Sequence, residues 1–418
     1  MAPSVIETDL LIPGRGDPIK DAALAWENDR IVWLRAATKV EKVPVITPGL
    51  WDCHVHFLGT TSYQTEDIWR EPRALCSARG ARDVAELLNA GYTSVRELGG
   101  DGHELAKAIN EGYLAGPNIY SSVSVLSPTA GHGDGHSIPL DTFKDACSHG
   151  MVFEVCDGVP ECLRAVRLQL RRGAKVIKVC ASGGVASEID DPHHQEFSDD
   201  ELRAMVEEAH RAQRVVAAHC HGKAGIMAAL HTGVTTIEHG TYIDDEAISE
   251  MLEKKAILVP TRTIHENGLK LREHWTDKSY AKLQVVAAHQ FTTYQKAIKA
   301  GARIALGSDL GCSRANTVLS HGQNGIELKY AVDAGMTPLQ AIEAATAAGP
   351  ETLGPPAPRA GQLKEGFDAD FIALSSNPLD NIEILSQAKN VTHVWKGGKQ
   401  FKSPAVAGRW LFPGLRQS

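Results

Sequence analysis

Apolar positions recur along this chain in one order: a helical pattern, a glycine, and then a short β-branched or apolar run. The order occurs in ELLNAGYTSVREL, QLRRGAKVIKVC, ALHTGVTTIEHG and AIKAGARIALGSD. A glycine just past a helix takes the left-handed conformation that ends helices, and the run after it is typical of a buried strand. Strands that alternate with helices in this way are parallel strands joined by crossovers.

Eight segments between residues 46 and 310 have the composition of such strands. They are ITPGLWDCHVH, YTSVREL, NIYSSVSV, KVIKVC, VVAAHCH, TTIEH, AILVPT and RIALGSD. Eight strand–helix units predict an α/β protein with a TIM-like (β/α)8 barrel, which we place over residues 48–357. A doubly wound open sheet is the alternative. The GDGHE segment that begins at Gly100 does not extend into the G-x-G-x-x-G pattern of such sheets.

The two ends of the chain have a different pattern. DAALAWENDRIVWL predicts a hairpin around a polar turn, and VTHVWKGGKQF predicts a second hairpin around Gly397 and Gly398. The proline-rich segment LGPPAPRAG separates the last of these strands from the barrel. We therefore expect residues 1–47 and 358–418 to form one small β-sandwich domain beside the barrel.

Composition and charge narrow the functional classes. The 43 Lys and Arg against 51 Asp and Glu give a net charge of −8, which argues against nucleic acid or an anionic membrane surface as a partner. No C-x-x-C pair occurs among the eight cysteines, which disfavours a structural zinc knuckle and indicates a reducing compartment. The N-terminal segment lacks the pattern of a secretory signal, so we expect a cytoplasmic protein. No apolar run is long enough for a bilayer.

Polar side chains that bind metals follow the predicted strands. His54 and His56 alternate along one strand, so they share a face and lie ~6.6 Å apart, close enough to hold one ion. Two surface histidines are the alternative. His219, His221 and His239 end two further strands. Three strand ends in order that close on histidine favour a metal site over isolated polar residues.

Two more strand ends carry charged groups. Lys178 lies inside KVIKVC, where a lysine either extends to the strand end or carries a functional amine. A neutral amine that has reacted with CO2 becomes a carbamate, an anionic ligand that can bridge two cations. Asp309 ends RIALGSD, where it is either the cap of a following helix or a metal ligand and proton carrier.

These motifs together resemble the amidohydrolase superfamily of metal-dependent hydrolases on a distorted (β/α)8 barrel. The matching segments are DCHVH, IKVCASGG, AAHCHG, IEHG, LGSD and the C-terminal LKEGFDADFIALSSNPLDNI. The resemblance covers essentially the whole chain. It implies two divalent cations, zinc by preference, with a carbamate on Lys178 as a bridge. The implied metal ligands are His54, His56, Lys178, His219, His239 and Asp309.

Within the superfamily the chain is similar to the branch that contains Xaa-Pro dipeptidase-like enzymes and ochratoxinase. This resemblance implies a small-molecule amide substrate, attack by a metal-bridging hydroxide, Asp309 as base and then acid, and a homo-oligomer. The substrate is an N-acyl amino acid, a dipeptide or an ochratoxin-like amide. His136, His132, His221 and Tyr242 are the implied substrate contacts, with His136 favoured over His132.

Loops after the last two predicted strands are expected to line the pocket. They contribute the basic residues Arg262, His265, Arg314 and His321, which together with apolar neighbours favour a substrate with an apolar body and a carboxylate. A deaminase or lactonase of the same superfamily is an alternative, although deaminases there use one metal without a bridging lysine. A non-catalytic scaffold is another alternative, but none of the six expected ligands is missing.

Overall fold

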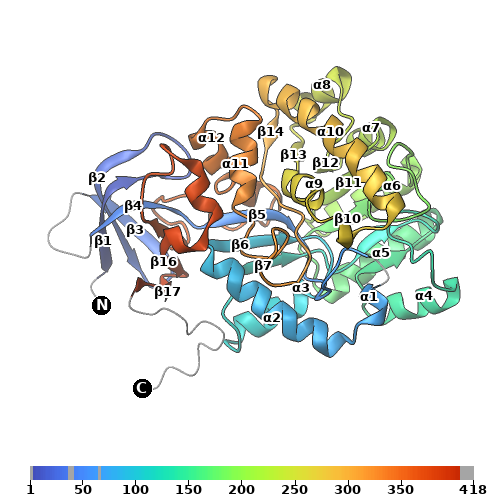
Figure 1. Cartoon of the computed structure of the whole chain (residues 1–418), viewed down its shortest axis with the longest axis horizontal. Coiled ribbons are helices and arrows are strands. Elements are labelled where there is room, and N and C mark those ends of the chain that lie inside the picture. The colour runs from blue at the N-terminus through green and yellow to red at the C-terminus, as the bar shows by residue number, and fades with distance from the viewer. Residues whose placement is uncertain (1–2, 36–41, 65–66, 405–418) are drawn as a thin grey trace.

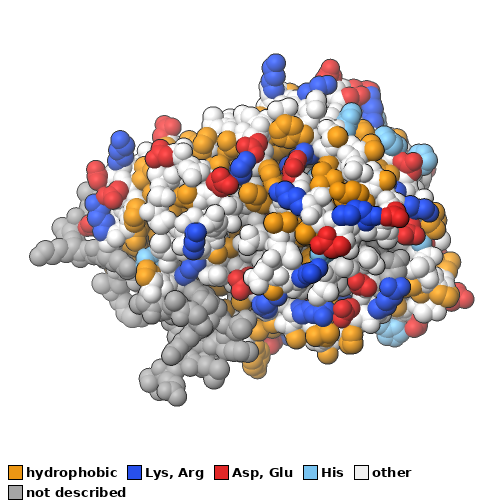
Figure 2. Space-filling view, viewed as in Figure 1, with side chains coloured by type: hydrophobic (Ala, Val, Ile, Leu, Met, Phe, Trp, Pro, Cys, Tyr) orange, Lys and Arg blue, Asp and Glu red, His pale blue; other side chains and the backbone are white. Residues whose placement is uncertain are grey.

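The computed structural model describes residues 3–35, 42–64 and 67–404. One sheet lies at one end of the molecule, and an α/β body with parallel strands forms the rest (Figure 1). On the face in Figure 2, acidic and basic side chains are interspersed over both parts. Among the described residues, no helix is both long enough and apolar enough to cross a membrane.

The sheet at the end of the molecule has seven strands in the order β17-β16-β15-β4-β1-β2-β3. These strands are β1 (Ser4–Leu11), β2 (Ile19–Glu27), β3 (Arg30–Arg35), β4 (Lys42–Pro48), β15 (Phe371–Leu374), β16 (Val391–Lys396) and β17 (Lys399–Lys402). Antiparallel pairing of β2 with β3 and of β16 with β17 confirms both predicted hairpins. The two chain ends therefore share one sheet, while the sandwich and the predicted domain boundaries stay predictions.

Aromatic side chains hold this sheet together across segments that are far apart in sequence. The ring of Trp26 lies 5.0 Å from that of Phe371 and 6.1 Å from that of Trp395. Phe371 and Trp395 are stacked at 4.6 Å. Such aromatic pairs add stabilisation beyond the apolar area that they bury. The N-terminal hairpin and the C-terminal strands are thus joined by packing as well as by backbone hydrogen bonds.

Parallel strands form two further sheets, a seven-stranded one in the order β14-β13-β12-β11-β10-β8-β9 and a three-stranded one in the order β5-β6-β7. The strands are β5 (Leu50–Val55), β6 (Tyr92–Glu97), β7 (Asn118–Ser121), β8 (Val125–Ser127), β9 (Phe153–Val155), β10 (Ile177–Cys180), β11 (Val216–Cys220), β12 (Thr236–His239), β13 (Ile257–Val259) and β14 (Arg303–Ile304). From β10 to β14 the strands follow their order in the sequence, and β9 pairs with β8 at the edge of the larger sheet.

One predicted strand is wrong in detail. The segment NIYSSVSV forms two strands, β7 and β8, that belong to different sheets. Between them the backbone turns sharply, because Ser124 N–H donates to Ser122 O at 3.0 Å and Val123 has a φ of 71°. The short strand β9, which pairs with β8 at the sheet edge, was not predicted.

Backbone contacts join the first and last predicted strands. Cys53 N–H donates to Leu306 O and His56 N–H donates to Leu310 O, each at 2.9 Å. Val55 and Leu310 also form a parallel bridge. The end of β5 thus lies beside the segment after β14, although a barrel closed along its whole circumference stays a prediction.

Helices surround the parallel strands in Figure 1. They are α1 (Asp67–Arg70), α2 (Arg73–Asn89), α3 (Gly102–Asn110), α4 (Leu140–Ser148), α5 (Gly158–Arg172), α6 (Asp199–Arg211), α7 (Lys223–Thr232), α8 (Asp245–Lys254), α9 (Arg262–Gly268), α10 (Asp277–Lys299), α11 (Ile326–Asp333), α12 (Pro338–Ala344) and α13 (Ala348–Glu351), with the 3-10 turns η1 (Arg272–His274), η2 (Ile382–Ser386) and η3 (Ala388–Asn390). The glycines of the recurring pattern, Gly91, Gly173, Gly233 and Gly301, all have positive φ and confirm the predicted helix ends.

The core of the body is continuous between strands and helices. Apolar residues of β5, β6, β10, β11 and β12 pack with those of the surrounding helices in one large cluster. All eight cysteines are buried and free, as the absence of paired spacing predicts. This packed body holds the carboxyl ends of the parallel strands rigidly, which is where polar side chains gather.

Candidate active site

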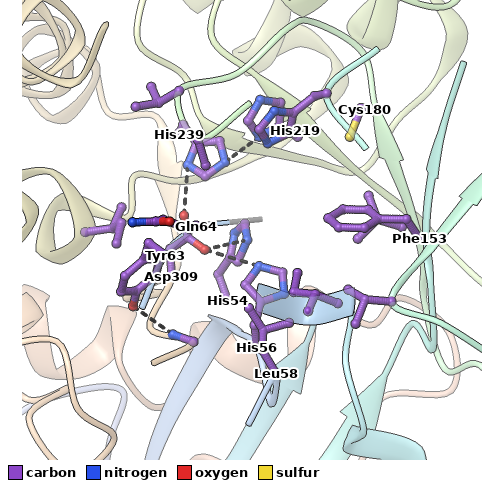
Figure 3. Close-up of a pocket in the computed structure, with 18 of the residues that line it drawn as sticks. His54, His56, Leu58, Tyr63, Gln64, Phe153, Cys180, His219, His239 and Asp309 are labelled. Atoms are coloured by element: carbon purple, nitrogen blue, oxygen red, sulfur yellow. Dashed lines mark hydrogen bonds and ion pairs between the residues drawn. The ribbon is translucent and has the colours of Figure 1, made fainter. Parts of the chain in front are cut away.

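A pocket opens where the parallel strands end (Figure 3). All six residues that the sequence predicts as metal ligands line it: His54, His56, Lys178, His219, His239 and Asp309. They come from β5, β10, β11, β12 and the segment after β14. Because the strands are parallel, their carboxyl ends meet on one side and bring together side chains separated by up to 255 positions.

Asp309 lies at the centre of the first group of donors. Its Oδ1 is 3.2 Å from His56 Nε2 and 3.5 Å from His54 Nε2, and its Oδ2 is 3.9 Å from His239 Nδ1. Donor atoms that share one tetrahedral zinc ion lie ~3.3 Å apart, given bonds of about 2.0–2.1 Å. Asp309 therefore lies at the spacing of a shared cation from His56 and from His54. One nitrogen each of His54 and His239 and an Asp309 oxygen all lie within 4.8 Å of one another.

A second group consists of three imidazoles. His219, His221 and His239 each offer a nitrogen within 4.8 Å of the others. His219 Nδ1 lies 2.8 Å from His239 Nε2, and the rings of His221 and His239 are stacked at 4.8 Å. The sequence interpretation placed His221 near the substrate, but this geometry also makes it a candidate ligand.

Two of these residues have strained backbones. Asp309 has a φ of 58° and His239 a φ of 69°, in the left-handed region that residues with a side chain rarely adopt. Asp309 N–H donates to His54 O at 2.7 Å, which holds the residue against the end of β5. Strain of this kind persists where the surrounding structure fixes it, and it concentrates at functional sites.

Hydrogen bonds on the far side of the rings fix which nitrogen faces the pocket. His54 Nδ1–H donates to Glu238 Oε2 at 2.8 Å, and His56 Nδ1–H donates to Gly99 O at 2.8 Å. Both rings therefore present Nε2 to Asp309. A carboxylate or carbonyl behind a metal-binding histidine is the usual arrangement that orients the ring and raises its basicity.

The carboxylate of Glu238 is itself paired inside the body. Arg96 donates to Glu238 Oε1 at 2.8 Å, and both side chains are 0% exposed. Arg96 also donates to Cys53 O at 2.6 Å and to Thr236 Oγ1 at 2.9 Å, so it joins β5, β6 and β12. Arg96 lowers the pKa of Glu238 to about 2 against the effect of burial, which keeps the acceptor of His54 ionised.

Asp52 connects the ends of the first and last strands. Its carboxylate accepts hydrogen bonds from Ser308 N–H at 3.0 Å, from the Ser308 hydroxyl at 2.6 Å and from Asn324 Nδ2 at 2.8 Å. His54 N–H donates to the same carboxylate at 3.1 Å. Sequence reasoning missed this role and that of Glu238, although both lie within two residues of a predicted ligand.

Among the six predicted metal ligands, Lys178 is the one whose buried side-chain nitrogen lacks a hydrogen-bond partner. Its side chain is 3% exposed, and Nζ has no hydrogen-bond partner in the described part of the chain. Burial lowers the pKa of Lys178, so the amine is more readily neutral than an exposed lysine. A buried amine without a hydrogen-bond partner is unusual in a folded protein. A neutral amine is the form that reacts with CO2.

Charge in the pocket suits cations. Burial holds the pKa values of His219, His221 and His239 well below the usual range, so these rings are neutral. Burial raises the pKa of Asp309, but His54, His56 and Lys178 outweigh it and hold the carboxyl ionised. Neutral imidazoles around one carboxylate form a donor set that fits divalent metal ions.

The predicted substrate contacts divide into two groups. His132 lines the pocket, where its ring stacks on that of His219 at 4.3 Å and its Nδ1 lies 2.8 Å from Ser187 Oγ. His136 lines a neighbouring cavity instead, and the preference for His136 as a substrate contact stays a prediction.

Tyr242 does not line this pocket either. Its ring packs on His193 at 4.2 Å and on His289 at 4.6 Å. Gly240 has a φ of 61°, and the turn that follows His239 carries the tyrosine away from the strand ends. Proximity in sequence to a ligand therefore did not bring Tyr242 into the pocket.

The pocket walls are mainly apolar. They include Leu58, Ile68, Val125, Val152, Phe153, Val185, Ile264, Trp275 and Leu283. The ring of Tyr63 stacks on that of Trp275, with 5.4 Å between the ring centres, and adds a further uncharged surface to the wall. Sequence reasoning missed Tyr63, which lies in the loop after the first predicted strand, and Phe153, which lies on the unpredicted strand β9.

Of the four basic residues expected in the pocket, His265 lines it and the other three do not. Arg262 donates to Ala287 O at 2.7 Å between α9 and α10. His321 Nε2–H donates to His56 O at 3.0 Å. Arg314 donates to the ring of His274 at 3.1 Å. The hydrogen bonds of these three side chains join loops outside the pocket, so they add no cation to its lining.

Comparisons with known proteins agree with the site. Residues 45–401 match the model of the amidohydrolase family. Ochratoxinase from Aspergillus niger is 46% identical over 435 residues, which cover 97% of this chain and 88% of the relative. The crystal structure of A. niger ochratoxinase has a TM-score of 0.90 and covers 97% of both chains. A Xaa-Pro dipeptidase structure with bound methionine has 28% identity and a TM-score of 0.85, and covers 96% of this chain and 100% of the other.

Proposed function

Because the chain belongs to the amidohydrolase family of metal-dependent hydrolases and acts on C–N bonds, we propose that it cleaves the amide bond of an N-acyl amino acid, a dipeptide or an ochratoxin-like amide with two divalent cations. One observation carries the proposal. Six donor side chains from five separate strand ends line a single pocket. A decayed scaffold would have no reason to retain all of them.

The donor set assigns residues to the two cations. His54, His56 and Asp309 would hold the first, since Asp309 Oδ1 lies 3.2 Å from His56 Nε2 and 3.5 Å from His54 Nε2. His219 and His239 hold the second, with His221 as an additional candidate. Lys178 would complete the site as an anionic carbamate ligand, formed when its neutral amine reacts with CO2 and loses a proton. Zinc is the first choice for a set so rich in imidazole.

The bound cations supply Lewis-acid polarisation of the scissile carbonyl and a water acidic enough to attack at neutral pH. The chain does the rest. Asp309 accepts a proton from the attacking water and returns it to the amide nitrogen, because an amine leaves poorly unless it is protonated. His132 faces the same space and contacts the substrate. Apolar walls bind its body and exclude water, which strengthens every electrostatic contact in the pocket.

The walls also bear on the substrate class. Phe153, Ile264 and Trp275 suit a bulky apolar or aromatic body more than a small dipeptide with two charged ends. The 46% identity to ochratoxinase supports the same choice. We therefore rank an ochratoxin-like amide or an aromatic N-acyl amino acid above a Xaa-Pro dipeptide. Deamination and lactone hydrolysis are less favoured because neither explains a buried, unpartnered Lys178.

The proposal also includes the architecture, the assembly and the location of the protein. The bonds between β5 and residues 306–310 support a closed (β/α)8 barrel. The sheet shared by both chain ends supports a small accessory domain. Its β-sandwich architecture stays a prediction. A homo-oligomeric state and a cytoplasmic location stay predictions from the sequence.

The test combines metal content with a substrate panel. Zinc-loaded protein is expected to hold about two equivalents by elemental analysis and to release the free amino acid from ochratoxin A and N-benzoyl-L-phenylalanine. Protein with Asp309→Asn, prepared in parallel, controls for contaminating hydrolases. Near-zero metal, or two metals with no hydrolysis of any amide in the panel, would contradict the proposal.

A further inference from the structure

Two buried side-chain atoms in the pocket lack any hydrogen-bond partner. Among the described residues that line it, they are Lys178 Nζ and His265 Nδ1. A buried polar atom left unpaired destabilises a protein, so each case in a native protein needs an explanation. The proposed carbamate and cations explain Lys178. Nothing in the metal site explains His265.

His265 lies in α9, on the side of the pocket formed by α9, η1 and α10. Its side chain is 2% exposed, and the neighbouring wall consists of Ile264, Trp275 and Leu283, which pack in one apolar cluster. Its ring centre is 6.1 Å from that of His221 and 6.3 Å from that of His239. The imidazole is thus next to the proposed metal site without being part of it.

The surroundings of this imidazole narrow what it can bind. Its side chain is 2% exposed against an apolar wall, and such burial favours the neutral form of an imidazole. A neutral imidazole donates one hydrogen bond and accepts another, but it does not act as the counter-ion of a carboxylate. The surrounding apolar wall provides no other charge. An uncharged hydroxyl or carbonyl oxygen is the partner that such a group satisfies.

We propose that His265 is a specificity-determining residue that hydrogen-bonds an uncharged oxygen on the apolar body of the substrate. The proposal rests on the proposed amide hydrolysis and names the feature that distinguishes a good substrate. The apolar wall then binds the body of the substrate, and His265 recognises one polar atom on it. A pocket built to hydrogen-bond such a group discriminates against the analogue that lacks it, because the buried imidazole is then left unpaired.

The experiment compares four amides that differ in one group. N-Benzoyl-L-phenylalanine is the parent, and the three analogues carry one hydroxyl at the ortho, meta or para position of the benzoyl ring. With zinc-loaded wild-type protein, we expect at least one hydroxylated analogue to exceed the parent about ten- to hundredfold in kcat/KM. In His265→Leu and His265→Phe this ratio is expected to fall to near one.

Three variants test whether the hydroxyl preference comes from the hydrogen bond of His265. His265→Phe keeps the ring volume, so it tests the hydrogen bond if His265→Leu leaves a cavity that disturbs the fold. His265→Asn keeps a polar atom near Nδ1 and is expected to restore part of the preference. Thr60→Val is the matched control, because the Thr60 hydroxyl lines the same pocket but already donates to Ser62 O at 3.0 Å. It is expected to keep the wild-type ratio.

Calorimetric titration of benzoic acid and its three hydroxylated forms into zinc-loaded protein gives the same comparison without turnover. Failure of wild type to hydrolyse any of the amides would refute the proposed function, while the titration would still report the preference. No hydroxyl preference in wild type, or an unchanged preference in His265→Leu and His265→Phe, would overturn the role of His265.

Discussion

The buried ion pair behind His54 gives the sharpest prediction of stability. Arg96→Met removes the guanidinium that pairs with Glu238 at 2.8 Å where both side chains are 0% exposed. Loss of one partner leaves a carboxylate in a dry interior, and such changes cost about 3–5 kcal/mol. His54 and Thr236 still donate to Glu238, so we expect about 3 kcal/mol, the lower end of that range.

A double-mutant cycle separates the pair from its surroundings. Glu238→Gln leaves the Arg96 cation buried and is expected to cost a similar amount. The double variant Arg96→Met/Glu238→Gln leaves no buried charge, so it is expected to be at least ~2 kcal/mol more stable than the sum of the single losses predicts. Urea unfolding of the metal-free proteins, followed by circular dichroism, measures all four free energies of unfolding.

An exposed ion pair with the same spacing is the control for the effect of burial. Arg167 and Glu208 pair at the same 2.8 Å, but the arginine side chain is 63% exposed. Because solvent screens such pairs, the Arg167→Met and Glu208→Gln cycle is expected to give a coupling of about 0–1 kcal/mol. Equal coupling in the two cycles, or additive losses in the Arg96 cycle, would refute the argument that burial determines the energy.

The same pair has a consequence for the metal site. Glu238 fixes the tautomer of His54, so Glu238→Gln is expected to weaken zinc binding about 10–100-fold in competition with a chelator. The Arg167→Met variant is expected to bind zinc normally. Normal zinc affinity in Glu238→Gln would mean that His54 keeps its orientation without the carboxylate.

Three further predictions follow from the site and from the terminal sheet. Asp309→Asn is expected to keep the fold and much of the metal but to lower kcat about 10²–10⁴-fold, and near-normal turnover would contradict its role as proton carrier. Lys178→Ala is expected to lose activity and regain part of it as acetate or formate is added, whereas full activity without added carboxylate would count against the carbamate. Burial raises the pKa of Asp370 from 3.8 to about 6. Between pH 3.8 and 6 the folded protein therefore binds more protons at this carboxyl than the unfolded protein does. The free energy of unfolding is expected to fall as pH rises through this range, by about 3 kcal/mol at most. Asp370→Asn, which can still accept from Gly397 N–H, is expected to remove that part of the pH dependence in urea unfolding, and an unchanged profile would refute it.

Local pattern was enough to predict most strands and helix ends. The glycines after the helices have positive φ because only the left-handed conformation turns the chain back towards the next strand. The break at Val123 was not visible, since a run of serine and valine has no turn residue to mark it. Strand β9 was missed because three residues carry too little periodicity.

Within the site, the sequence indicated the donors but not their surroundings. His54 and His56 share a face because side chains alternate along a strand, and Asp309 lies beside them because parallel strands end on one side. Their supporting partners were not predictable, since Arg96 and Glu238 meet across 142 positions of sequence. Such contacts depend on which strands become neighbours.

The sequence by itself thus determined the chemistry at the strand ends, because period and spacing are properties of one segment. Only the tertiary structure decided that His132 rather than His136 reaches the pocket and that Arg262 turns away from it. It also left His265 without a partner. The physical reason is that the direction of a loop side chain depends on the segments packed around it, and these are distant in sequence.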